Sequence, residues 1–402
     1  MSRARKLGIY VEPSGGLGGA EYLAAVLAEG LSGRRHDIEL VHHQRALRPE
    51  QLEGFTGADL SSVSLRYVPR RPTQTTTTPL LWRLWRQNSR WDEELSRPYE
   101  TFVNLTHGVP PFCHARHSVL IVLFPFFKRN WMRDDPPRGI DPRRRARNAY
   151  HDFEWRRRMR TYSHITSISE FTRRWTKAYW DIDSTVVYPP VDTTSPGRVK
   201  QDIVLSVGRF STTGHSKKHG EIIRAFGDLP ALRESGWRHH LVGGLSDRPA
   251  DRTYFAQLQG MAGPGTSLLA NVARSEIKEQ FARAKLFVHA AGFGESPSKP
   301  EAEEHFGIVT VEAMAAGAVP IVVNRGGQPE VVEHGVSGFV WNTIEELKHY
   351  IVTLAGDDAR REQMAAAARI RAARFSRQNF LNRMSALLPY EPTESGASEK
   401  VG

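Results

Sequence analysis

Two glutamates in the second half of the chain, Glu304 and Glu312, have the types and spacing to bind a sugar phosphate. They enclose seven residues in the run EHFGIVTVE. A strand ending at His289 predicts a loop that carries Glu304, and a helix beginning near Gly307 carries Glu312 on its second turn. The helix N-terminus accepts a phosphate, and the flanking carboxylates accept hydrogen bonds from hydroxyls. A ligand with phosphates between two sugars would match. The alternative is that both are ordinary surface glutamates, Glu304 in a loop and Glu312 on the solvated side of a helix.

Cations that could hold a diphosphate follow the strand predicted at 203–207. Gly208 lets the backbone turn, Arg209 can bind one phosphate through its planar guanidinium, and a lysine some eight residues further can reach the other. Lys217 fits the spacing better, and Lys218 is the second candidate. Because the chain has no Asp-x-Asp pair in a suitable loop, we expect these cations, rather than a metal ion, to neutralise a leaving diphosphate. The alternative is that Arg209 and the lysine are ordinary surface residues that bind no ligand.

A glycine-rich loop, GGLGGAE at 15–21, follows the first predicted strand at 7–11 and precedes a helix predicted at 19–31. Glycines permit close backbone approach to a ligand at a helix N-terminus, so Gly18 and Gly19 are candidate binding residues. The spacing does not fit the Gly-x-Gly-x-x-Gly pattern of a dinucleotide site.

These residues need a scaffold that brings strand ends together. Short apolar runs at 7–11, 38–41, 65–68, 101–105, 119–123 and 165–169 alternate with helical patterns in the first half. Runs at 203–207, 239–242, 286–289 and 319–323 do the same in the second half. This alternation predicts two doubly wound α/β domains with parallel sheets. Paired prolines at 189–190 mark the linker between them.

Composition limits the partners and the compartment. The 402 residues carry a formal charge of +11, and residues 128–160 contain twelve Lys or Arg against five Asp or Glu. This basic segment predicts an anionic membrane surface or a phosphorylated acceptor as partner, with a merely solvated surface as the alternative. Nucleic acid is not expected, because no nucleic-acid-binding signature accompanies the charge. No apolar run is long enough to span a membrane, no secretory signal is recognisable, and Cys113 is the single cysteine. We therefore expect a cytoplasmic protein, peripheral at the inner face of the membrane if the basic segment binds lipid.

The segment EHFGIVTVEAMAAG at 304–317, with VPIV at 319–322 and GGQPE at 326–330, resembles the donor site of retaining family 4 glycosyltransferases of the GT-B fold. The resemblance implies two Rossmann-like domains facing across a cleft. Residues 1–192 would bind the acceptor, 193–376 would bind a nucleotide sugar, 377–390 would form a helix crossing back to the first domain, and 391–402 would be a disordered tail. The resemblance is specific from 203 to 339 and only topological before 163.

The resemblance also implies roles for single residues. Glu312 would bind the ribose hydroxyls and Glu304 the donor sugar, and Arg209 and Lys217 would stabilise the leaving diphosphate. Backbone groups of Phe306, Gly307 and Ile308 would contact sugar and phosphate, and Asn271 and Val272 the base. His107 is the candidate for a cleft histidine, with a structural or solvent-facing role as the alternative. The resemblance names no covalent nucleophile, and it implies neither a metal ion nor another cofactor.

The expected activity is therefore a retaining, metal-independent transfer of a hexose from a nucleotide-diphosphate sugar to a hydroxyl of a glycan or lipid-linked acceptor. The expected setting is cell-envelope or polysaccharide biosynthesis. One alternative is another GT-B enzyme, a nucleotide-sugar epimerase or a phosphorylase, but the further cleft acids or the cofactor lysine that these require are not recognisable. The other alternative is a basic membrane- or nucleic-acid-binding protein with a degenerate fold, which predicts a broken donor site.

Overall fold

The structure is a computed structural model that describes residues 5–12, 18–32, 36–71, 81–126, 142–212 and 216–388. The tail predicted at 391–402, positions 15–17 of the glycine-rich loop and residues 128–141 of the basic segment lie outside the described residues.

The described strands of the first half form one parallel sheet in the order β3-β2-β1-β4-β5-β6-β7. Their apolar side chains are buried on both faces of the sheet, as expected for parallel strands covered by helices. The strands are β1 (Arg5–Val11), β2 (His36–His42), β3 (Val63–Tyr67), β4 (Thr101–Thr106), β5 (His117–Val122), β6 (His164–Ser167) and β7 (Thr185–Val186).

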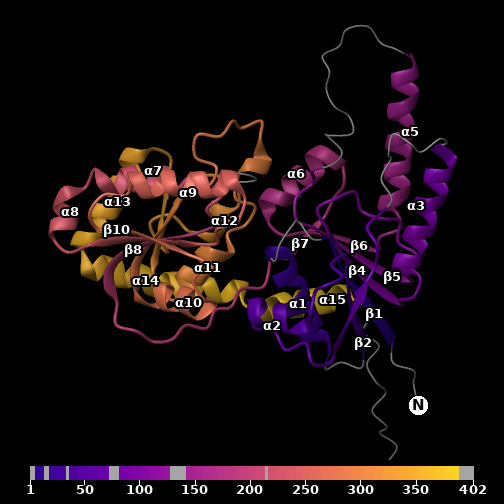
Figure 1. Cartoon of the computed structure of the whole chain (residues 1–402), viewed down its shortest axis with the longest axis horizontal. Coiled ribbons are helices and arrows are strands. Elements are labelled where there is room, and N and C mark those ends of the chain that lie inside the picture. Colours follow the sequence, from indigo (N-terminus) through magenta and orange to yellow (C-terminus); the bar gives the residue numbers. More distant parts are fainter. Residues whose placement is uncertain are drawn as a thin grey trace, which may run out of the picture.

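Helices cover this sheet, and two of them form its outer end (Figure 1). The helices are α1 (Gly19–Ser32), α2 (Pro49–Thr56), α3 (Leu81–Ser96), α5 (Pro142–Met159) and α6 (Glu170–Trp180). Helices α3 and α5 lie side by side, joined by an ion pair between Arg158 and Asp92 at 3.7 Å. Helix α6 begins after Ser169, whose side chain accepts a hydrogen bond from the backbone N–H of Thr172.

The described strands of the second half form another parallel sheet, in the order β10-β9-β8-β11-β12-β13. Its strands are β8 (Gln201–Val207), β9 (Arg238–Gly243), β10 (Thr266–Ala270), β11 (Ala284–His289), β12 (Val319–Val323) and β13 (Phe339–Trp341). Its α-helices are α7 (His219–Gly227), α8 (Pro230–Glu234), α9 (Pro249–Met261), α10 (Arg274–Arg283), α11 (Ile308–Ala315), α12 (Gln328–Val331), α13 (Ile344–Gly356) and α14 (Asp358–Ala372). Two short 3-10 helices are η1 (Pro300–Ala302) and η2 (Ala373–Phe375).

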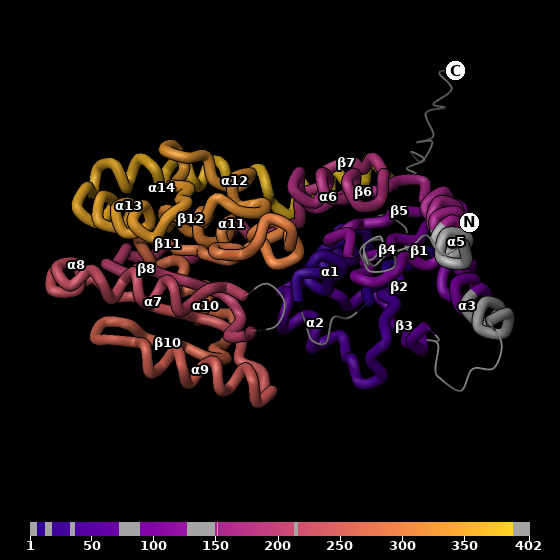
Figure 2. Tube along the Cα trace, turned by 90° about the horizontal axis from the view of Figure 1, so that it is seen from above, coloured from indigo at the N-terminus to yellow at the C-terminus, as the bar shows by residue number. Residues whose placement is uncertain are grey.

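The last described helix, α15 (Arg377–Leu387), returns to the first domain, as predicted. Figures 1 and 2 show the two domains side by side, and Figure 1 shows α15, in yellow, beside α1 of the indigo half. Phe380 and Met384 are buried in a core that also contains residues of α1. Leu381 packs so closely on α1 that a Cβ added at Gly30 would lie 2.3 Å from it. The predicted fold, two doubly wound domains with a returning helix, is confirmed.

Candidate functional site

The carboxyl ends of β8 and β11 carry the segments with the predicted site residues. In a parallel sheet these ends lie at one edge, where ligands of α/β proteins bind. Here that edge faces the first domain, because His305, beyond β11, contacts Phe124, beyond β5. The fold therefore places the candidate residues at the boundary between the domains.

Lys217 and Glu304, which are separated by 87 positions, meet in a mostly buried ion pair between Nζ and Oε2. Nε2 of His289, at the end of β11, lies 3.2 Å from the same carboxylate oxygen. Burial lowers the pKa of His289, although Glu304 opposes the effect. A neutral His289 that donates its Nε2 proton to Glu304 fits this environment. Side chains from two other segments, Lys217 and His289, thus converge on Glu304.

Gly208 leaves the space that Lys217 occupies, since a Cβ at Gly208 would lie 2.6 Å from Cγ of Lys217. The backbone of Gly208 is fixed by a hydrogen bond of 2.9 Å from its N–H to the carbonyl of Val242. Arg209 is exposed directly after it. Within the described residues Arg209 forms no ion pair, so its guanidinium is available for an anionic ligand.

Lys218 points elsewhere, although it is next to Lys217. It precedes α7 with a left-handed backbone (φ 55°), and its Nζ lies 2.5 Å from Oε1 of Glu295. Glu295 belongs to the loop after β11. Of the two lysines considered from the sequence, Lys217 is therefore the one that contacts Glu304.

Glu312 lies on the second turn of α11 and is buried. Its Oε1 accepts a hydrogen bond from Arg274, the first residue of α10. Burial raises the pKa of Glu312, and the charge of Arg274 opposes this. Its Oε2 is buried and has no hydrogen-bond partner among the described residues. A ligand hydroxyl could donate to that oxygen.

Two helix N-termini, one from each domain, meet at Ile308, a few residues after Glu304 in the chain. Gly307 precedes α11 with φ 108°, and a Cβ there would lie 2.5 Å from the side-chain nitrogen of Gln328. A Cβ added at Gly19, the first residue of α1, would lie 3.7 Å from Cδ1 of Ile308. The N–H of Gly18 donates to Oε2 of Glu21 at 2.8 Å. Partial positive charge from both helices is therefore directed at one region.

Phe306 is in the same run, but its side chain is buried in the core. Only its backbone could face a ligand, as the resemblance implied. The rings of Tyr188 and Phe375 lie 5.6 and 5.3 Å from it.

Asn271 and Val272 follow β10, at some distance along the sheet edge from Glu304. Asn271 has φ 55°, its side chain makes two hydrogen bonds to the backbone of Leu245, and its N–H donates to Gly243. The side chain of Asn271 thus shapes the loop after β9, and Val272 packs against the core of the second domain. A role in binding the base stays a prediction.

His107 follows β4 in the first domain and is half-buried. Burial lowers its pKa, while nearby Glu12 raises it. Glu12 accepts hydrogen bonds from the hydroxyl of Thr106 and, at 2.9 Å, from the N–H of Gly108. No contact described in this structure joins His107 to the second-domain residues above, so its place in the cleft remains a prediction.

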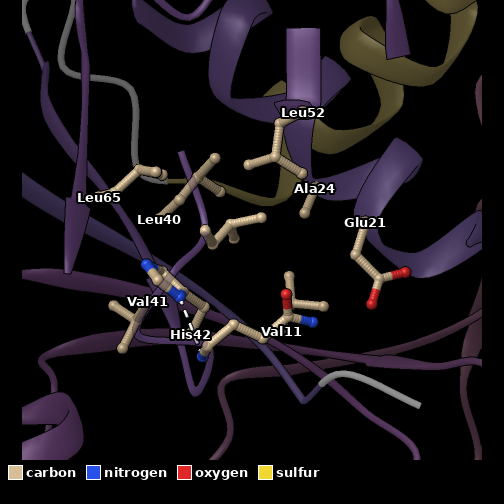
Figure 3. A pocket seen from close by; sticks show the side chains of 10 residues that line it. Val11, Glu21, Ala24, Leu40, Val41, His42, Leu52 and Leu65 are labelled. Atoms are coloured by element: carbon tan, nitrogen blue, oxygen red, sulfur yellow. Dashed lines mark hydrogen bonds between the residues drawn. The ribbon is translucent and has the colours of Figure 1, made fainter. Parts of the chain in front are cut away.

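A small cavity lies near the start of α1, with a volume of about 30 Å³. Figure 3 shows the carboxylate of Glu21 on one side of it and His42 on another, with the apolar side chains of Leu40 and Leu52 on a further side. Burial raises the pKa of Glu21 and lowers that of His42. The cavity could accommodate about one water molecule and is too small for a sugar.

The described part of the basic segment is α5 and its end. Arg156, Arg157 and Arg160 are exposed, and so are the rings of Tyr150 and Phe153. Arg158, by contrast, is buried. It donates to the carbonyl of Pro110 at 2.8 Å, pairs with Glu154 and lies 4.3 Å from the centroid of the Phe112 ring. One of the twelve basic residues therefore holds the fold together and does not contribute to a charged surface.

Three site residues were not predicted from the sequence: Arg274, His289 and Glu295. His289 ends a predicted strand at the binding edge, a position that could have marked it. Arg274 and Glu295 offered no comparable signal, because their partners lie 38 and 77 positions away.

Two structural features are absent from the described ranges, a metal-binding cluster and a membrane-spanning helix. Among these residues, no group of three or more His, Cys, Asp or Glu could hold a metal ion. None of the helices traced there is both long and apolar enough to cross a membrane.

Two family models match the chain. The model described as Glycosyltransferase Family 4 matches residues 17–195, and the model described as Glycosyl transferases group 1 matches residues 194–371. Their shared boundary lies in the connection between β7 and β8.

Among curated proteins, the chain is similar to the "GDP-Man:Man(3)GlcNAc(2)-PP-Dol alpha-1,2-mannosyltransferase" of Dictyostelium discoideum. The two are 28% identical over 242 residues, which are 55% of this chain and 44% of the relative. The Homo sapiens protein of that name is 29% identical over 217 residues, 48% of this chain and 41% of the relative. The chain thus spans less than half the length of these relatives.

Solved structures resemble nearly the whole chain. The crystal structure of Anabaena HepE in complex with UDP and glucose has a TM-score of 0.67 at 19% identity, covering 95% of this chain and 98% of that chain. WaaG, a glycosyltransferase involved in lipopolysaccharide biosynthesis, has a TM-score of 0.65 at 14% identity, with coverage of 96% and 100%. At these identities the likeness concerns the fold.

Proposed function

Since the chain belongs to the family 4 glycosyltransferases and has their GT-B fold, we propose that it transfers a hexose from a nucleotide-diphosphate sugar to a hydroxyl of a glycan or lipid-linked acceptor. Residues 193–376 would bind the donor and residues 1–192 the acceptor. The names of its relatives, which specify a GDP-Man donor and a PP-Dol-linked glycan, support an acceptor of this class.

One observation carries this proposal: the contact of Lys217 with Glu304, in the segment that leads into the N-terminus of α11. In this structure the cation proposed for the diphosphate and the carboxylate proposed for the sugar neutralise each other. A nucleotide sugar supplies a partner for each, phosphate oxygens for Lys217 and hydroxyls for Glu304. Arg209, exposed beside them, would bind a second phosphate group.

The proposed reaction retains the configuration at the anomeric carbon. The acceptor oxygen attacks on the face from which the diphosphate leaves, and its proton passes to a departing phosphate oxygen. Arg209, Lys217 and the helix N-terminus at Gly307 would stabilise the negative charge that develops on that leaving group. With these cations present we propose that neither a metal ion nor another cofactor takes part.

Glu312 would hold the ribose through its buried carboxylate, and Arg274 would keep that carboxylate ionised. The support is geometric, because one carboxylate oxygen already faces Arg274 and the other has no described partner. Backbone groups around Phe306 to Ile308 would contact the sugar and phosphates, with Gly18 and Gly19 opposite them. Asn271 and Val272 would border the base, and His107 would lie toward the acceptor.

We further propose a cytoplasmic enzyme of cell-envelope or polysaccharide biosynthesis that binds the inner membrane surface peripherally. Its basic segment at 128–160 would face anionic headgroups, with the exposed rings of Tyr150 and Phe153 entering the interface. A lipid-linked acceptor lies at such a surface, so docking there would bring enzyme and substrate together. Nucleic acid is not expected to bind.

The proposal is tested by thermal stabilisation with GDP-, UDP-, dTDP- and ADP-hexoses. A ligand present at 100 times its dissociation constant should add about 2.7 kcal/mol to the unfolding free energy. The donor identified in this way is then incubated with lipid-linked and soluble glycan acceptors, and the anomeric configuration of the product is read by NMR. Stabilisation by none of these donors would exclude a nucleotide-sugar enzyme, and an inverted product would exclude the retaining mechanism.

A further inference from the structure

His305 follows Glu304 in the second domain, yet its ring is buried among rings of the first domain. It stacks on Phe124, with centroids 4.2 Å apart and planes 12° from parallel. Phe126 lies 6.0 Å away and Phe171 6.3 Å away. Phe124 and Phe126 follow β5, and Phe171 is in α6, the helix that Figures 1 and 2 place at the boundary between the domains.

The backbone beside this ring is also held by the first domain. The hydroxyl of Ser169 donates to the carbonyl oxygen of His305 at 2.6 Å. Ser169 is the residue that caps α6, so a single helix start supports the ring through Phe171 and the peptide through Ser169. The carboxylate of Glu330, from α12 of the second domain, accepts hydrogen bonds from the N–H groups of Glu170 and Phe171 at 2.7 and 2.5 Å.

The opposite side of the same peptide rests on two glycines of the second domain. The N–H of Gly327 donates to the carbonyl of Glu304 at 2.7 Å. A Cβ added at Gly326 would lie 2.0 Å from that carbonyl oxygen, and one at Gly327 would lie 2.6 Å from the carbonyl oxygen of His305. The peptide that carries Glu304 therefore has little room to shift while the domains are together.

We propose that His305 is a positioning residue: insertion of its ring between Phe124 and Phe171 makes the placement of Glu304 depend on closure of the two domains. This inference rests on the proposed function, because it requires Glu304 to contact the donor sugar. When the domains separate, the ring leaves its aromatic surroundings and the Ser169 hydrogen bond is broken. Glu304 then loses the support that reaches it through His305, while its described contacts with Lys217, His289 and the two glycines can remain.

Binding of the nucleotide part of the donor should not depend on the ring of His305. Arg209, Lys217, Arg274 and Glu312 all belong to the second domain, and their described contacts do not involve His305. Loss of the ring should therefore reduce turnover and leave the binding of a nucleoside diphosphate unchanged. Substitution of a residue that merely stabilised the fold would change turnover and nucleoside diphosphate binding together, or change neither of them.

The experiment compares His305→Leu with His305→Phe, Phe124→Leu and the double variant His305→Leu/Phe124→Leu. Tyr179→Leu is the matched control, since Tyr179 belongs to an aromatic pair on the same helix α6, 4.8 Å from Trp175. For each protein we would measure kcat with saturating donor and acceptor, the nucleoside diphosphate Kd by calorimetry, and the melting temperature. The nucleoside diphosphate is the one whose hexose the wild type uses.

We expect kcat of His305→Leu to fall roughly tenfold, the size of effect that loss of a stacked ring pair allows, with Kd unchanged. His305→Phe, which keeps a planar ring, should recover kcat to within about threefold. Phe124→Leu should show the same loss as His305→Leu, and the double variant should be little worse than either, because both remove one contact. The Tyr179→Leu control should turn over like the wild type.

Each other outcome decides against the inference. Wild-type kcat in His305→Leu, equal loss in His305→Phe and His305→Leu, or multiplicative losses in the double variant would each overturn the positioning role. These outcomes leave the proposed function standing, because the wild type still transfers sugar. If the wild type turns over no nucleotide sugar, the proposed function fails and this inference fails with it.

Discussion

The role of Glu312 can be tested by Glu312→Gln, which removes the charge and keeps the shape. In the structure Oε1 pairs with Arg274 and Oε2 is buried without a described partner, so a ribose hydroxyl has one acceptor to reach. A hydrogen bond to a charged acceptor contributes about 1.5–3 kcal/mol, and a neutral one about 1 kcal/mol. The amide should therefore cost about 0.5–2 kcal/mol of binding, roughly a twofold to thirtyfold rise in the Kd of the nucleoside diphosphate.

The effect of the same substitution on stability should be small. Arg274 keeps 37% of its side chain exposed, so water can solvate the guanidinium when its partner is neutral. We expect the melting temperature to fall by at most about 4 °C. A loss of about 1 kcal/mol lowers the melting temperature of a domain of about 150–250 residues by about 2–4 °C. A rise in Kd with little change in melting temperature would therefore reflect lost binding and not lost stability.

The assay is calorimetric titration of the nucleoside diphosphate, and Glu279→Gln is the matched control. Glu279 lies on α10, as Arg274 does, and pairs with Arg198 through two hydrogen bonds of 2.8 Å outside the site. Glu279→Gln removes one negative charge from an arginine–carboxylate pair, as Glu312→Gln does. An unchanged Kd in Glu312→Gln, or an equal rise in the control, would refute the assignment of Glu312 to the ribose.

Three further predictions concern the cations, the linker and metal ions. Gly208→Ala should raise the donor KM about tenfold by displacing Lys217, because the added Cβ would lie 2.6 Å from Cγ of Lys217. The control is Gly227→Ala, where the added Cβ meets open space. Equal KM values in the two variants would contradict the prediction. Burial alone would raise the pKa of Asp192, but hydrogen bonds from Lys278 and Thr194 outweigh it and lower the pKa to about 2. Because that value lies below the unfolded pKa of about 3.9, the ionised group stabilises the fold above that pH and loses its contribution as the pH falls toward 2. Asp192→Asn should therefore lower the urea midpoint at pH 7 by an amount that shrinks between pH 4 and pH 3, and a constant difference would argue against the linkage. A chelator should leave the transfer rate unchanged; loss of activity in chelator with recovery in manganese would show that a metal ion neutralises the leaving group.

Local patterns were sufficient to predict most of the scaffold. Apolar runs such as 203–207 and 319–323 became β8 and β12, because buried parallel strands need continuous apolar residues. The helix carrying Glu312 begins after Gly307, as its sequence predicts. Three strands, β7, β10 and β13, were not predicted. The two or three residues of β7 and β13 carry too little periodicity to distinguish them from a loop, and β10 is a partly exposed edge strand with a short apolar run.

The partners within the site could not be predicted in the same way. The ion pairs Arg274–Glu312 and Lys218–Glu295 form between segments that are neighbours only after the sheet has assembled. The choice between Lys217 and Lys218 depended on the left-handed backbone at Lys218, which directs its side chain to the loop after β11. Likewise, nothing local to His305 indicates that its ring would be buried among the rings of Phe124 and Phe171.

The return of α15 to the first domain has a consequence for biosynthesis. Phe380, Met384 and Leu388 complete a core whose other members include Leu23 and Leu27 of α1. A ribosome releases those early residues first, and the entire second domain must be translated before the covering helix follows. Until then the apolar residues of the first domain that α15 covers remain exposed in the nascent chain, so we expect chaperones that bind unfolded apolar segments to associate with it during translation.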